Sequence, residues 1–494
     1  MKKIVIIGGG IAGLSAGCYA QMNGYEAHIY EMHNGPGGLC TAWKRNGYTF
    51  DICIHWLEGT SPDSEFYEIW QELGAIQGKK IYYKDVSIKL FLKDQIINFY
   101  NDPDKLAKYL KEIAPEDSNI IDEFTEALRK WYQLLDMPLT KPKELFTIVD
   151  TVKMIISFMP IIKLVKKYSK ITVDEFADKF RNELLQQAIR SLMVDYDSLN
   201  VFGILFLLAT KGYGFPQGGS LDFAKSIEKR YTSLGGKIHY GAKIKKILVS
   251  DNKAVGIQLE NGKEVNADIV ISAADGYSTI FKMLDGKFTN KKIRNIYENE
   301  EVFPSYLQVS IGVDMNSSNN SDLNSNYNVY KLDKPIMIAG QEKKYMSLKN
   351  YAFDPTFAPN GKSTLVVGLK SELPYWEKLY QDKELYRQEK KKVETTVISS
   401  LEKFMPGIKD KIEAIDVATP MTIFRYTNNW KGSTMGFVNP FSLNMPRTLP
   451  KLKNFFMVGQ WVGNTGVSGA ALSGRDILEY ICVKNKKKFT TTKP

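Results

Sequence analysis

The sequence is poor in residues that bind metals or form cross-links. Its 494 residues include four histidines and four cysteines, and the cysteines (Cys18, Cys40, Cys53 and Cys482) show no Cys-x-x-Cys spacing. Zinc and iron–sulfur sites in proteins need closely spaced thiolate or imidazole ligands. We therefore expect no metal site. Unpaired, scattered cysteines are also typical of proteins from reducing compartments.

Long hydrophobic runs are missing as well. No apolar stretch approaches the roughly 20 residues that span a bilayer. The first predicted strand begins at Lys3, which leaves no room ahead of it for a signal peptide. We expect a cytoplasmic protein, with a peripheral position on the inner face of the membrane left open. The net charge of +11 favours an anionic partner, but no nucleic-acid-binding motif accompanies it, so we expect no nucleic-acid partner.

A nucleotide-binding fingerprint is present at the start of the chain. The apolar run at residues 4–7 leads into Gly8-Gly9-Gly10-Ile11-Ala12-Gly13, a helical stretch, and a second apolar run that ends on Glu31. This order predicts a strand, a Gly-x-Gly-x-x-Gly turn, a helix and a strand closed by an acid that holds ribose hydroxyls. The helix N-terminus would face the phosphates. Taken alone, the fingerprint fits NAD and FAD equally well.

Two further glycine clusters extend this pattern. Gly37-Gly38 follows Glu31 closely, and a strand at residues 455–458 leads into Gly459-Gln460 and a glycine-rich turn, 463–469. The helix after this turn offers a second N-terminus whose dipole stabilises negative charge. The pyrimidine edge of a flavin becomes anionic on reduction, whereas nicotinamide has no need of such a site. The clusters together therefore favour FAD.

The secondary-structure pattern divides the chain into interleaved blocks. We expect an α/β protein with an FAD-linked Rossmann-type (glutathione reductase-like) domain and an inserted substrate domain of mixed sheet and helices. The predicted FAD-binding domain comprises residues 1–70, 212–290 and 446–494. The predicted substrate domain comprises residues 71–211 and 291–445, with a helix-rich part at about 103–210.

The fingerprint, Gly37-Gly38, the segment Pro216–Ser220, the strand at Ala267-Asp268 and the C-terminal glycine-rich helix together resemble the phytoene desaturase family of FAD-dependent oxidoreductases, which includes carotenoid isomerases and retinol saturase. The resemblance covers nearly the whole chain. It implies that Glu31 holds the adenosine ribose, that Ile244 contacts adenine through its backbone, and that the C-terminal turn holds the pyrophosphate and flavin. Leu39 departs from the pattern, because many members have an arginine there.

The predicted cofactor-binding residues are Gly8, Gly10, Ile11, Ala12, Gly13, Glu31, Gly37, Gly38, Leu39, Ile244, Gly459, Gln460, Gly466, Val467 and Ser468. Catalytic residues are harder to predict, because a flavin itself takes or gives the hydride. His55, in an apolar context, is our candidate at the face of the flavin, although a structural histidine fits the same pattern. Arg425 is a candidate for the polar end of a substrate, with a solvated arginine as the alternative.

One apolar stretch, at residues 146–159, has a helical pattern with a single polar stripe formed by Asp150, Lys153 and Ser157. Lysines follow it at 163, 166, 167 and 170. An apolar helix flanked by lysines suits an interfacial position on anionic lipid, and a buried core helix is the alternative. The apolar segment 201–209 is expected in the core. The lysine-rich end, 484–488, is expected as a frayed basic end, with added attraction to a membrane surface as the alternative.

The sequence therefore predicts hydride transfer between FAD and an apolar polyene or isoprenoid substrate at a carbon–carbon bond, by desaturation, saturation or isomerisation. A flavin amine oxidase and a non-catalytic flavin- or lipid-binding protein are the alternatives, because fold and cofactor do not separate them. The substrate is an apolar small molecule in this interpretation. Its electron acceptor or donor stays open among quinone, oxygen and NAD(P)H.

Overall fold

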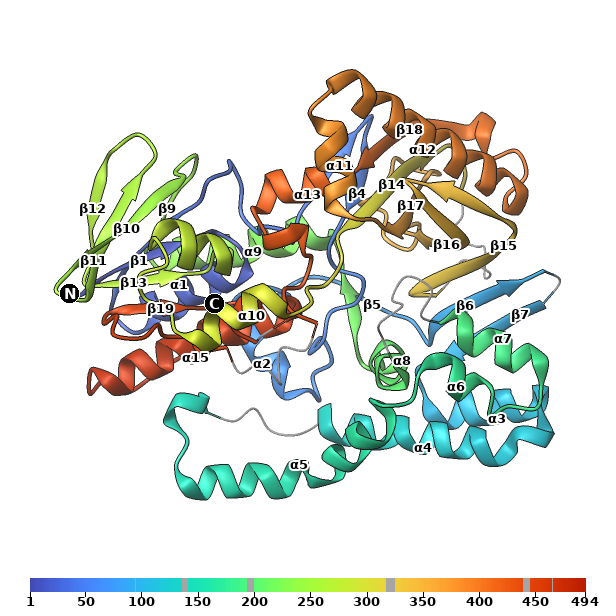
Figure 1. The fold of residues 1–494 in the computed structure, drawn as a ribbon, viewed down its shortest axis with the longest axis horizontal. Coiled ribbons are helices and arrows are strands. Elements are labelled where there is room, and N and C mark those ends of the chain that lie inside the picture. Colours follow the sequence, from blue (N-terminus) through green and yellow to red (C-terminus); the bar gives the residue numbers. More distant parts are fainter. Residues whose placement is uncertain (94, 136–140, 193–199, 317–324, 439–444, 464) are drawn as a thin grey trace.

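Two halves, each built around its own sheet, lie side by side along the long axis of the molecule (Figure 1). The structure is a computed structural model. It describes residues 1–494 except 94, 136–140, 193–199, 317–324, 439–444 and 464. Figure 1 shows both chain termini in the half that contains the N-terminal fingerprint.

The first half contains a five-stranded parallel sheet in the order β19-β13-β1-β2-β9. Its strands are β1 (Lys3–Ile7), β2 (Glu26–Tyr30), β9 (Lys237–His239), β13 (Ile269–Ser272) and β19 (Phe455–Met457). Central strands of such sheets are covered on both faces and read as continuous apolar runs. The run Ile4–Ile7 fits this rule, since each of its side chains is buried.

Helices from distant parts of the chain cover this sheet. They are α1 (Ile11–Met22), α2 (Glu65–Glu72), α9 (Gly219–Ser233), α10 (Lys291–Asn299) and α15 (Gly466–Lys484), with a short π-helix at Ser278–Met283. A Cβ on Gly474 of α15 would lie 2.6 Å from the backbone nitrogen of Ala16 in α1. Glycine at this crossing therefore allows the two helices to pack backbone to backbone. A small antiparallel sheet of β10 (Ile244–Ser250), β11 (Lys253–Leu259) and β12 (Glu264–Asn266) completes this half.

The second half contains a seven-stranded mixed sheet in the order β18-β14-β17-β16-β15-β6-β7. Only the β15–β6 pair is parallel, and it joins the N-terminal and C-terminal parts of this half. The strands are β6 (Val86–Leu92), β7 (Gln95–Tyr100), β14 (Tyr306–Val313), β15 (Tyr327–Ile338), β16 (Gln341–Asn350), β17 (Ser363–Lys370) and β18 (Ile412–Ala418).

Two short antiparallel strand pairs lie between the halves. They are β3 (Ala42–Arg45) with β4 (Tyr48–Asp51), and β5 (Ile81–Tyr83) with β8 (Gly214–Pro216). Although β3 and β4 follow the fingerprint in sequence, they pack on the second sheet, where Trp43 donates to Asp416 at 3.0 Å and Tyr48 donates to Glu413 at 2.6 Å. The loop that follows β4 is therefore held between the two halves.

Helices surround the second sheet. On one side lie α11 (Leu373–Tyr380), α12 (Lys383–Phe404) and α13 (Pro420–Thr427); the helical cap comprises α3 (Pro103–Ile113), α4 (Ser118–Leu135), α5 (Ile148–Tyr168), α6 (Val173–Ala177), α7 (Glu183–Ser191) and α8 (Val201–Leu208). Short 3₁₀ turns occur at Pro115–Asp117, Lys143–Leu145, Lys409–Lys411, Trp430–Gly432 and Gln460–Val462. The cap has its own core, and the prediction that segment 201–209 contributes to it is confirmed.

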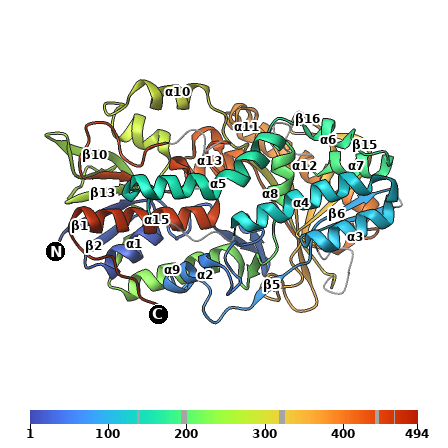
Figure 2. The same ribbon diagram turned by 90° about the horizontal axis from the view of Figure 1, so that it is seen from below.

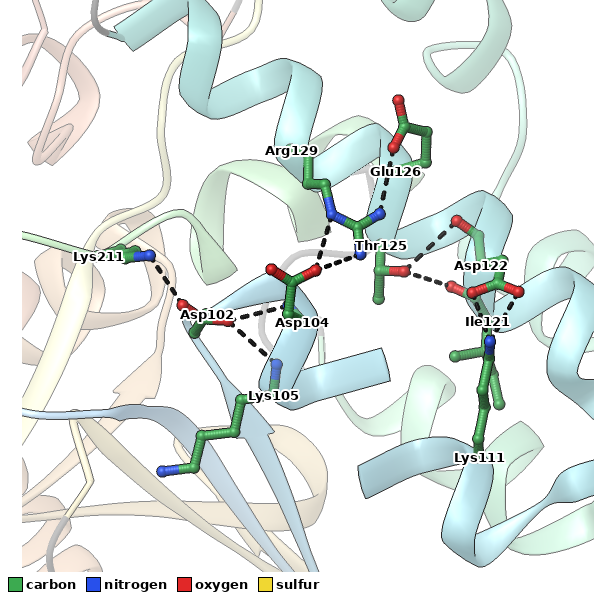
Figure 3. Close-up of polar contacts among 10 residues, drawn as sticks. All are labelled: Asp102, Asp104, Lys105, Lys111, Ile121, Asp122, Thr125, Glu126, Arg129 and Lys211. Atoms are coloured by element: carbon green, nitrogen blue, oxygen red, sulfur yellow. Dashed lines mark hydrogen bonds and ion pairs between the residues drawn. The ribbon is translucent and has the colours of Figure 1, made fainter. Parts of the chain in front are cut away.

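Ion pairs join α3 and α4 on the outside of the cap (Figure 3). The guanidinium of Arg129 in α4 lies 2.6 Å from the carboxylate of Asp104 in α3, and Lys111 of α3 lies 2.7 Å from Asp122 of α4. These side chains are largely exposed, so each pair contributes about 1 kcal/mol or less. The packing of α3 against α4 therefore depends mainly on the buried apolar faces of the two helices.

The C-terminal tail differs from the sequence expectation. Thr490 donates its backbone N–H to Asn23 at 2.8 Å, and Arg230 donates to the carbonyl of Thr492 at 2.7 Å. The ring of Phe489 packs 5.9 Å from that of Tyr19. The prediction of a frayed end is wrong, because polar groups at the C-terminus of α1 and on α9 bind the tail's backbone.

Candidate functional site

The fingerprint folds as the sequence predicts. Gly8 adopts a left-handed φ of +98°, and a Cβ on Gly13 would lie 2.0 Å from the carbonyl oxygen of Gly8. Gly10 is the N-cap of α1. A Cβ on Gly10 would have the carbonyl oxygen of Gly37 as its nearest neighbour, at 3.9 Å. Gly13 therefore brings the helix against the sheet, whereas Gly10 leaves open space over the N-terminus of α1, where a phosphate would bind.

Glu31, at the end of β2, is held by the backbone around it. One carboxylate oxygen accepts from Gly9 N–H at 2.6 Å and the other from His33 N–H at 2.9 Å. A carboxylate oxygen has about two acceptor positions, so each oxygen keeps one for a further donor. This arrangement presents a fixed acceptor pair beside the turn, which suits the two hydroxyls of a ribose.

The second glycine cluster packs directly on the first. Gly37 donates its N–H to the carbonyl of Gly9 at 2.9 Å, and both Gly37 and Gly38 have positive φ angles, +104° and +59°. A Cβ on Gly37 would lie 2.3 Å from the carbonyl of Cys40, so no other residue fits there. The chain thus closes over the fingerprint turn while leaving the space above Gly10 free.

The third cluster approaches from the C-terminal end of the chain. Gly459 has a φ of +94° and donates to the hydroxyl of Ser473 at 2.9 Å, which ties the turn to α15. The N-cap of α15, Thr465, makes no side-chain cap bond to the described part of the helix. The first N–H groups of α15 are therefore available to a ligand in front of them. Asn464, within the predicted turn, lies outside the described residues.

These clusters line one cleft of about 2280 Å³ between the two halves. Its lining includes the predicted residues Gly8, Gly10, Ile11, Ala12, Glu31, Gly37, Gly38, Leu39, Ile244, Gly459, Gln460, Gly466, Val467 and Ser468. Gly13 is not among the lining residues, because it packs the helix on the sheet instead. A typical small-molecule site measures about 300–1,000 Å³, so this cleft has room for a dinucleotide and a second ligand together.

The lining of the far part of the cleft is largely apolar and comes from the second sheet and the cap. Its residues include Ile88, Trp131, Met154, Ile155, Ile162, Val165, Phe206, Leu207, Tyr327, Val329 and Tyr345. These side chains lie on β6, β15, β16, α4, α5 and α8, so the walls of this region belong to segments that the sequence analysis placed in the substrate domain.

The two catalytic candidates lie in different environments. His55 lines the cleft, in the loop after β4, and its Nδ1 contacts Nζ of Lys349 on β16. Burial, together with the charge of Lys349, lowers the pKa of His55 well below its ordinary value. Arg425 is exposed on α13, donates to the hydroxyl of Tyr380 at 3.1 Å and does not line the cleft. The structure brings His55 to the site but not Arg425.

Several polar groups at the cleft escaped the sequence analysis. Glu58 lines the cleft and accepts from the hydroxyl of Ser468 at 2.8 Å, and burial raises the pKa of its carboxyl. Lys349 contacts His55, and the charge of Lys84 acts on Lys349. Burial lowers the pKa of Lys349 well below its ordinary value and that of Lys84 to about 7. No motif surrounds these residues, so only the tertiary structure reveals them.

The residues at the near end of the cleft fit FAD. An open cradle above Gly10 matches a phosphate, a fixed carboxylate at Glu31 matches a ribose, and the uncapped N-terminus of α15 matches an electron-accepting ring. Leu39 adds no charge there, and the two helix N-termini supply the positive potential instead. In the part of the chain that the structure describes, no group of three or more His, Cys, Asp or Glu side chains is placed to hold a metal ion.

A parallel sheet that carries a dinucleotide fingerprint, joined across a large cleft to a mixed sheet, defines a two-domain oxidoreductase fold. The chain belongs to the family of flavin-containing amine oxidoreductases, whose family model matches residues 11–477. The predictions of a flavoenzyme, of FAD as its cofactor and of an FAD-linked Rossmann-type fold are therefore confirmed.

Among curated proteins, the chain is similar to prolycopene isomerase 1 of an Oncidium hybrid cultivar, with 26% identity, covering 94% of this chain and 78% of the relative. It is 24% identical to a 4,4'-diaponeurosporene oxygenase of Staphylococcus haemolyticus, covering 97% of each chain. It is also 24% identical to all-trans-retinol 13,14-reductase of Danio rerio, covering 94% of this chain and 83% of the relative. The predicted resemblance to carotenoid- and retinol-type enzymes is confirmed.

Solved structures share the fold. An oxidoreductase from Methanosarcina mazei aligns with a TM-score of 0.60 at 18% identity, covering 97% of this chain and 100% of that one. Putrescine oxidase aligns with a TM-score of 0.62 at 12% identity, covering 98% and 99%. A reduced UDP-galactopyranose mutase aligns with a TM-score of 0.59 at 14% identity, covering 98% and 96%.

Proposed function

We propose that the protein is an FAD-dependent oxidoreductase that acts on a carbon–carbon double bond of an apolar polyene or isoprenoid. The observation that carries this proposal is the continuity of the cleft, which leads from the FAD-binding clusters past His55 to apolar walls on β6, β15, α4 and α8. A long apolar substrate would bury its chain there, with about 25 cal/mol of stabilisation for each Å² removed from water. The names of the curated relatives support the same class of substrate.

The protein's part in such a reaction is to position the substrate and to exclude water. Bound flavin supplies hydride chemistry at a carbon atom. The ring centroid of Trp56 lies 6.2 Å from that of His55 and 5.6 Å from that of Tyr327, so the three rings pack together at the wall of the cleft. These flat surfaces would hold a polyene chain in van der Waals contact and exclude water from its reacting bond.

The family's description makes amine oxidation the second candidate. An amine substrate enters as a cation and must lose its proton before oxidation. His55 contacts Lys349, and Lys84 acts on Lys349 through its charge; burial lowers the pKa values of both lysines. A cationic substrate would gain nothing from such neighbours, which favours the uncharged polyene.

Anaerobic flavin spectra test both candidates on the same protein. We expect the bound flavin to exchange electrons with a carotenoid or retinoid, visible as bleaching by a saturated substrate or as reoxidation of the reduced flavin by a polyene. Bleaching by amines without any response to polyenes would overturn the proposal in favour of amine oxidation. Ligand binding with no spectral change under either condition would favour a non-catalytic role.

We further propose that α5 binds the protein peripherally to an anionic membrane, on the cytoplasmic side. Seven of its apolar side chains are exposed: Ile148, Val149, Val152, Ile155, Ile156, Met159 and Ile162 have exposed fractions between 41% and 85%. Its polar stripe, Asp150, Lys153 and Ser157, lines the cleft together with Met154, Ile155 and Ile162. Figures 1 and 2 show α5 extending away from the rest of the cap, towards the half that contains α15.

This arrangement argues against the alternative of a buried core helix. A soluble protein rarely exposes a continuous apolar surface of this size, and the lysines at 163 and 170 are exposed at the same helix end, where anionic headgroups would attract them. Among the described residues, no helix is long and apolar enough to cross a bilayer, so α5 would lie in the interface. Substrate dissolved in the bilayer would then reach the cleft beside α5.

Vesicle sedimentation tests the membrane proposal. We expect the protein to sediment with phosphatidylglycerol-containing vesicles and much less with pure phosphatidylcholine. Ile156→Glu should abolish sedimentation, whereas Leu385→Glu, on another exposed apolar residue in α12, should leave it unchanged. Equal sedimentation of the two variants, or none for the unaltered protein, would contradict the proposal.

A further inference from the structure

A pair of buried bases lies at the wall of the cleft. Nδ1 of His55 contacts Nζ of Lys349, which joins the loop after β4 to β16, 294 residues later in the chain. His55 lines the cleft, whereas Lys349 lies behind it, 7% exposed, with its Nζ 4.9 Å from the ring centroid of Tyr327 and 5.8 Å from that of Tyr351. The second ring nitrogen of His55, Nε2, makes no hydrogen bond to the described residues.

The groups that face this pair leave it almost without counter-charge. Asp51 is the nearby carboxylate, and its oxygens already accept from Ser220 and Cys53. The positive charge of Lys84 lowers the pKa of Lys349, and Asp51 and Cys53 raise it more weakly. Tyr351 adds no charge, because burial raises the pKa of its hydroxyl well above the ordinary value.

Two bases in contact in such a place cannot both be cations, since like charges at hydrogen-bond distance repel strongly when water is excluded. The pair therefore holds one extra proton or none. An amine ordinarily binds a proton more tightly than an imidazole, so the extra proton resides on Nζ of Lys349. Nδ1 of His55 then accepts a hydrogen bond, and Nε2 must carry the hydrogen of the neutral ring.

When the pair loses that proton, the hydrogen bond reverses. The neutral amine of Lys349 accepts from Nδ1–H, and Nε2 of His55 presents its lone pair instead. We propose that Lys349 is a positioning residue that shares a single proton with His55 and thereby sets whether the imidazole presents an N–H or a lone pair to the substrate. This inference rests on the proposed function of the same cleft.

The chemistry balances in both directions. Saturation of a double bond breaks its π bond and forms two C–H bonds: one carbon receives a hydride with its electron pair, from the reduced cofactor, and its neighbour receives a proton. Nε2–H of His55 supplies that proton, Nδ1 takes one from Lys349, and a solvent proton restores the lysine. In desaturation, Nε2 takes a proton from carbon, Nδ1 passes one to Lys349, and the hydride leaves to the oxidised cofactor.

Nitrogen-15 spectra of histidine-labelled protein test the inference without any substrate. The chain has four histidines, so His55→Gln identifies the resonances of His55. As the pH rises, we expect His55 to convert from the Nε2–H to the Nδ1–H tautomer. No imidazolium should form at any pH between about 5 and 9, a range that brackets the ordinary pKa of histidine. Loss of Lys84 in Lys84→Met should move this conversion to higher pH, because a positive neighbour is removed.

Two variants of Lys349 should each abolish the tautomer conversion if the inference holds. Lys349→Met should leave His55 in one tautomer at every pH, and Lys349→Arg, which cannot lose its charge, should keep it in the Nε2–H form. If Lys349→Arg fails to fold, Lys349→Met and Lys84→Met still decide the question. The same pH-dependent conversion in unaltered protein and Lys349→Met, or an imidazolium in the unaltered protein, would overturn the inference.

Turnover separates this inference from the proposed function. If both hold, Lys349→Met should slow flavin reoxidation by a polyene about 10- to 100-fold and flatten its pH profile, with little change in KM. A tautomer conversion without any polyene reaction would leave the proton-sharing pair in place and reject the proposed function. Polyene turnover with an unchanged pH profile in Lys349→Met would reject the role of Lys349.

Discussion

Asp51 and Ser220 lie 169 residues apart in the chain and are joined by two hydrogen bonds of 2.6 Å. The backbone N–H and the hydroxyl of Ser220, at the start of α9, both donate to the buried carboxyl of Asp51, and Cys53 N–H donates to it at 3.0 Å. The hydroxyl of Ser220 in turn accepts from Ile54 N–H at 2.8 Å. This contact fixes the loop that carries His55 against the helix next to the cofactor clusters.

Replacing Asp51 with asparagine should weaken this joint. One carboxyl oxygen becomes an NH₂ group that faces a backbone donor, and a buried donor left without a partner costs about 1–3 kcal/mol. We expect Asp51→Asn to lower the free energy of unfolding in urea by that amount and to reduce FAD retention. Asp104→Asn, on an exposed ion pair, is the control and should cost about 0.5 kcal/mol (Figure 3). Equal losses in the two variants would contradict this role.

Alanine at two fingerprint glycines should separate folding from cofactor binding. A Cβ on Gly13 would lie 2.0 Å from a backbone oxygen that cannot move, so Gly13→Ala should yield unstable protein. Gly10 has a φ of −69° and open space around it, so Gly10→Ala should fold normally. Its methyl group would occupy the phosphate cradle, and FAD affinity, measured by fluorescence titration, should fall at least about tenfold, roughly 1.4 kcal/mol. Normal FAD binding by Gly10→Ala would refute the cradle.

Arg425 should be dispensable for chemistry. Its guanidinium lies 5.4 Å from the ring centroid of Tyr380 on the protein surface, outside the cleft. Surface contacts of this kind contribute about 1 kcal/mol or less. We expect Arg425→Ala to keep its flavin spectrum, its polyene turnover and nearly all of its stability, and a large loss of turnover would restore Arg425 as a catalytic candidate.

Local sequence patterns predicted the parts of the site that local geometry determines. The turn at Gly8–Gly13 and the tight passage at Gly37 require glycine for steric reasons, and such requirements are visible in the sequence itself. Glu31 was predictable because it ends the strand that follows the fingerprint. These residues assemble on one sheet edge, which their order along the chain already implied.

Long-range contacts were not predictable in the same way. Lys349 stands among other lysines in an unremarkable strand, and nothing in its neighbourhood indicates that it is buried against His55. The periodicity of α5 predicted one polar stripe, but a helical pattern does not reveal which face meets the protein. The polar stripe lines the cleft together with Met154, Ile155 and Ile162, whereas the other exposed apolar residues of α5 lie outside the cleft, and this division depends on what surrounds the helix.

Lys84 should make stability depend on pH. Its Nζ donates to the carbonyl of Ser325 at 2.8 Å and lies 4.3 Å from the ring centroid of Phe353, and burial lowers its pKa from 10.5 to about 7. Between these two values the unfolded chain binds more protons than the folded one, so the free energy of unfolding rises with pH. The stabilisation is complete above the unfolded pKa and is lost as pH falls through about 7.

Denaturant unfolding of the unaltered protein and of Lys84→Met measures this effect. The gap between the two pKa values sets an upper limit of about 5 kcal/mol, and solvent that reaches the side chain reduces it to a few kcal/mol. Between about pH 7 and pH 9.5, which lies between the two pKa values, we expect the free energy of unfolding of the unaltered protein to rise by that amount relative to Lys84→Met. Contributions from other groups cancel in the difference. A difference that stays constant with pH would mean that Lys84 keeps its ordinary proton affinity in the folded protein, and that its charge is compensated by neighbours other than Ser325 and Phe353.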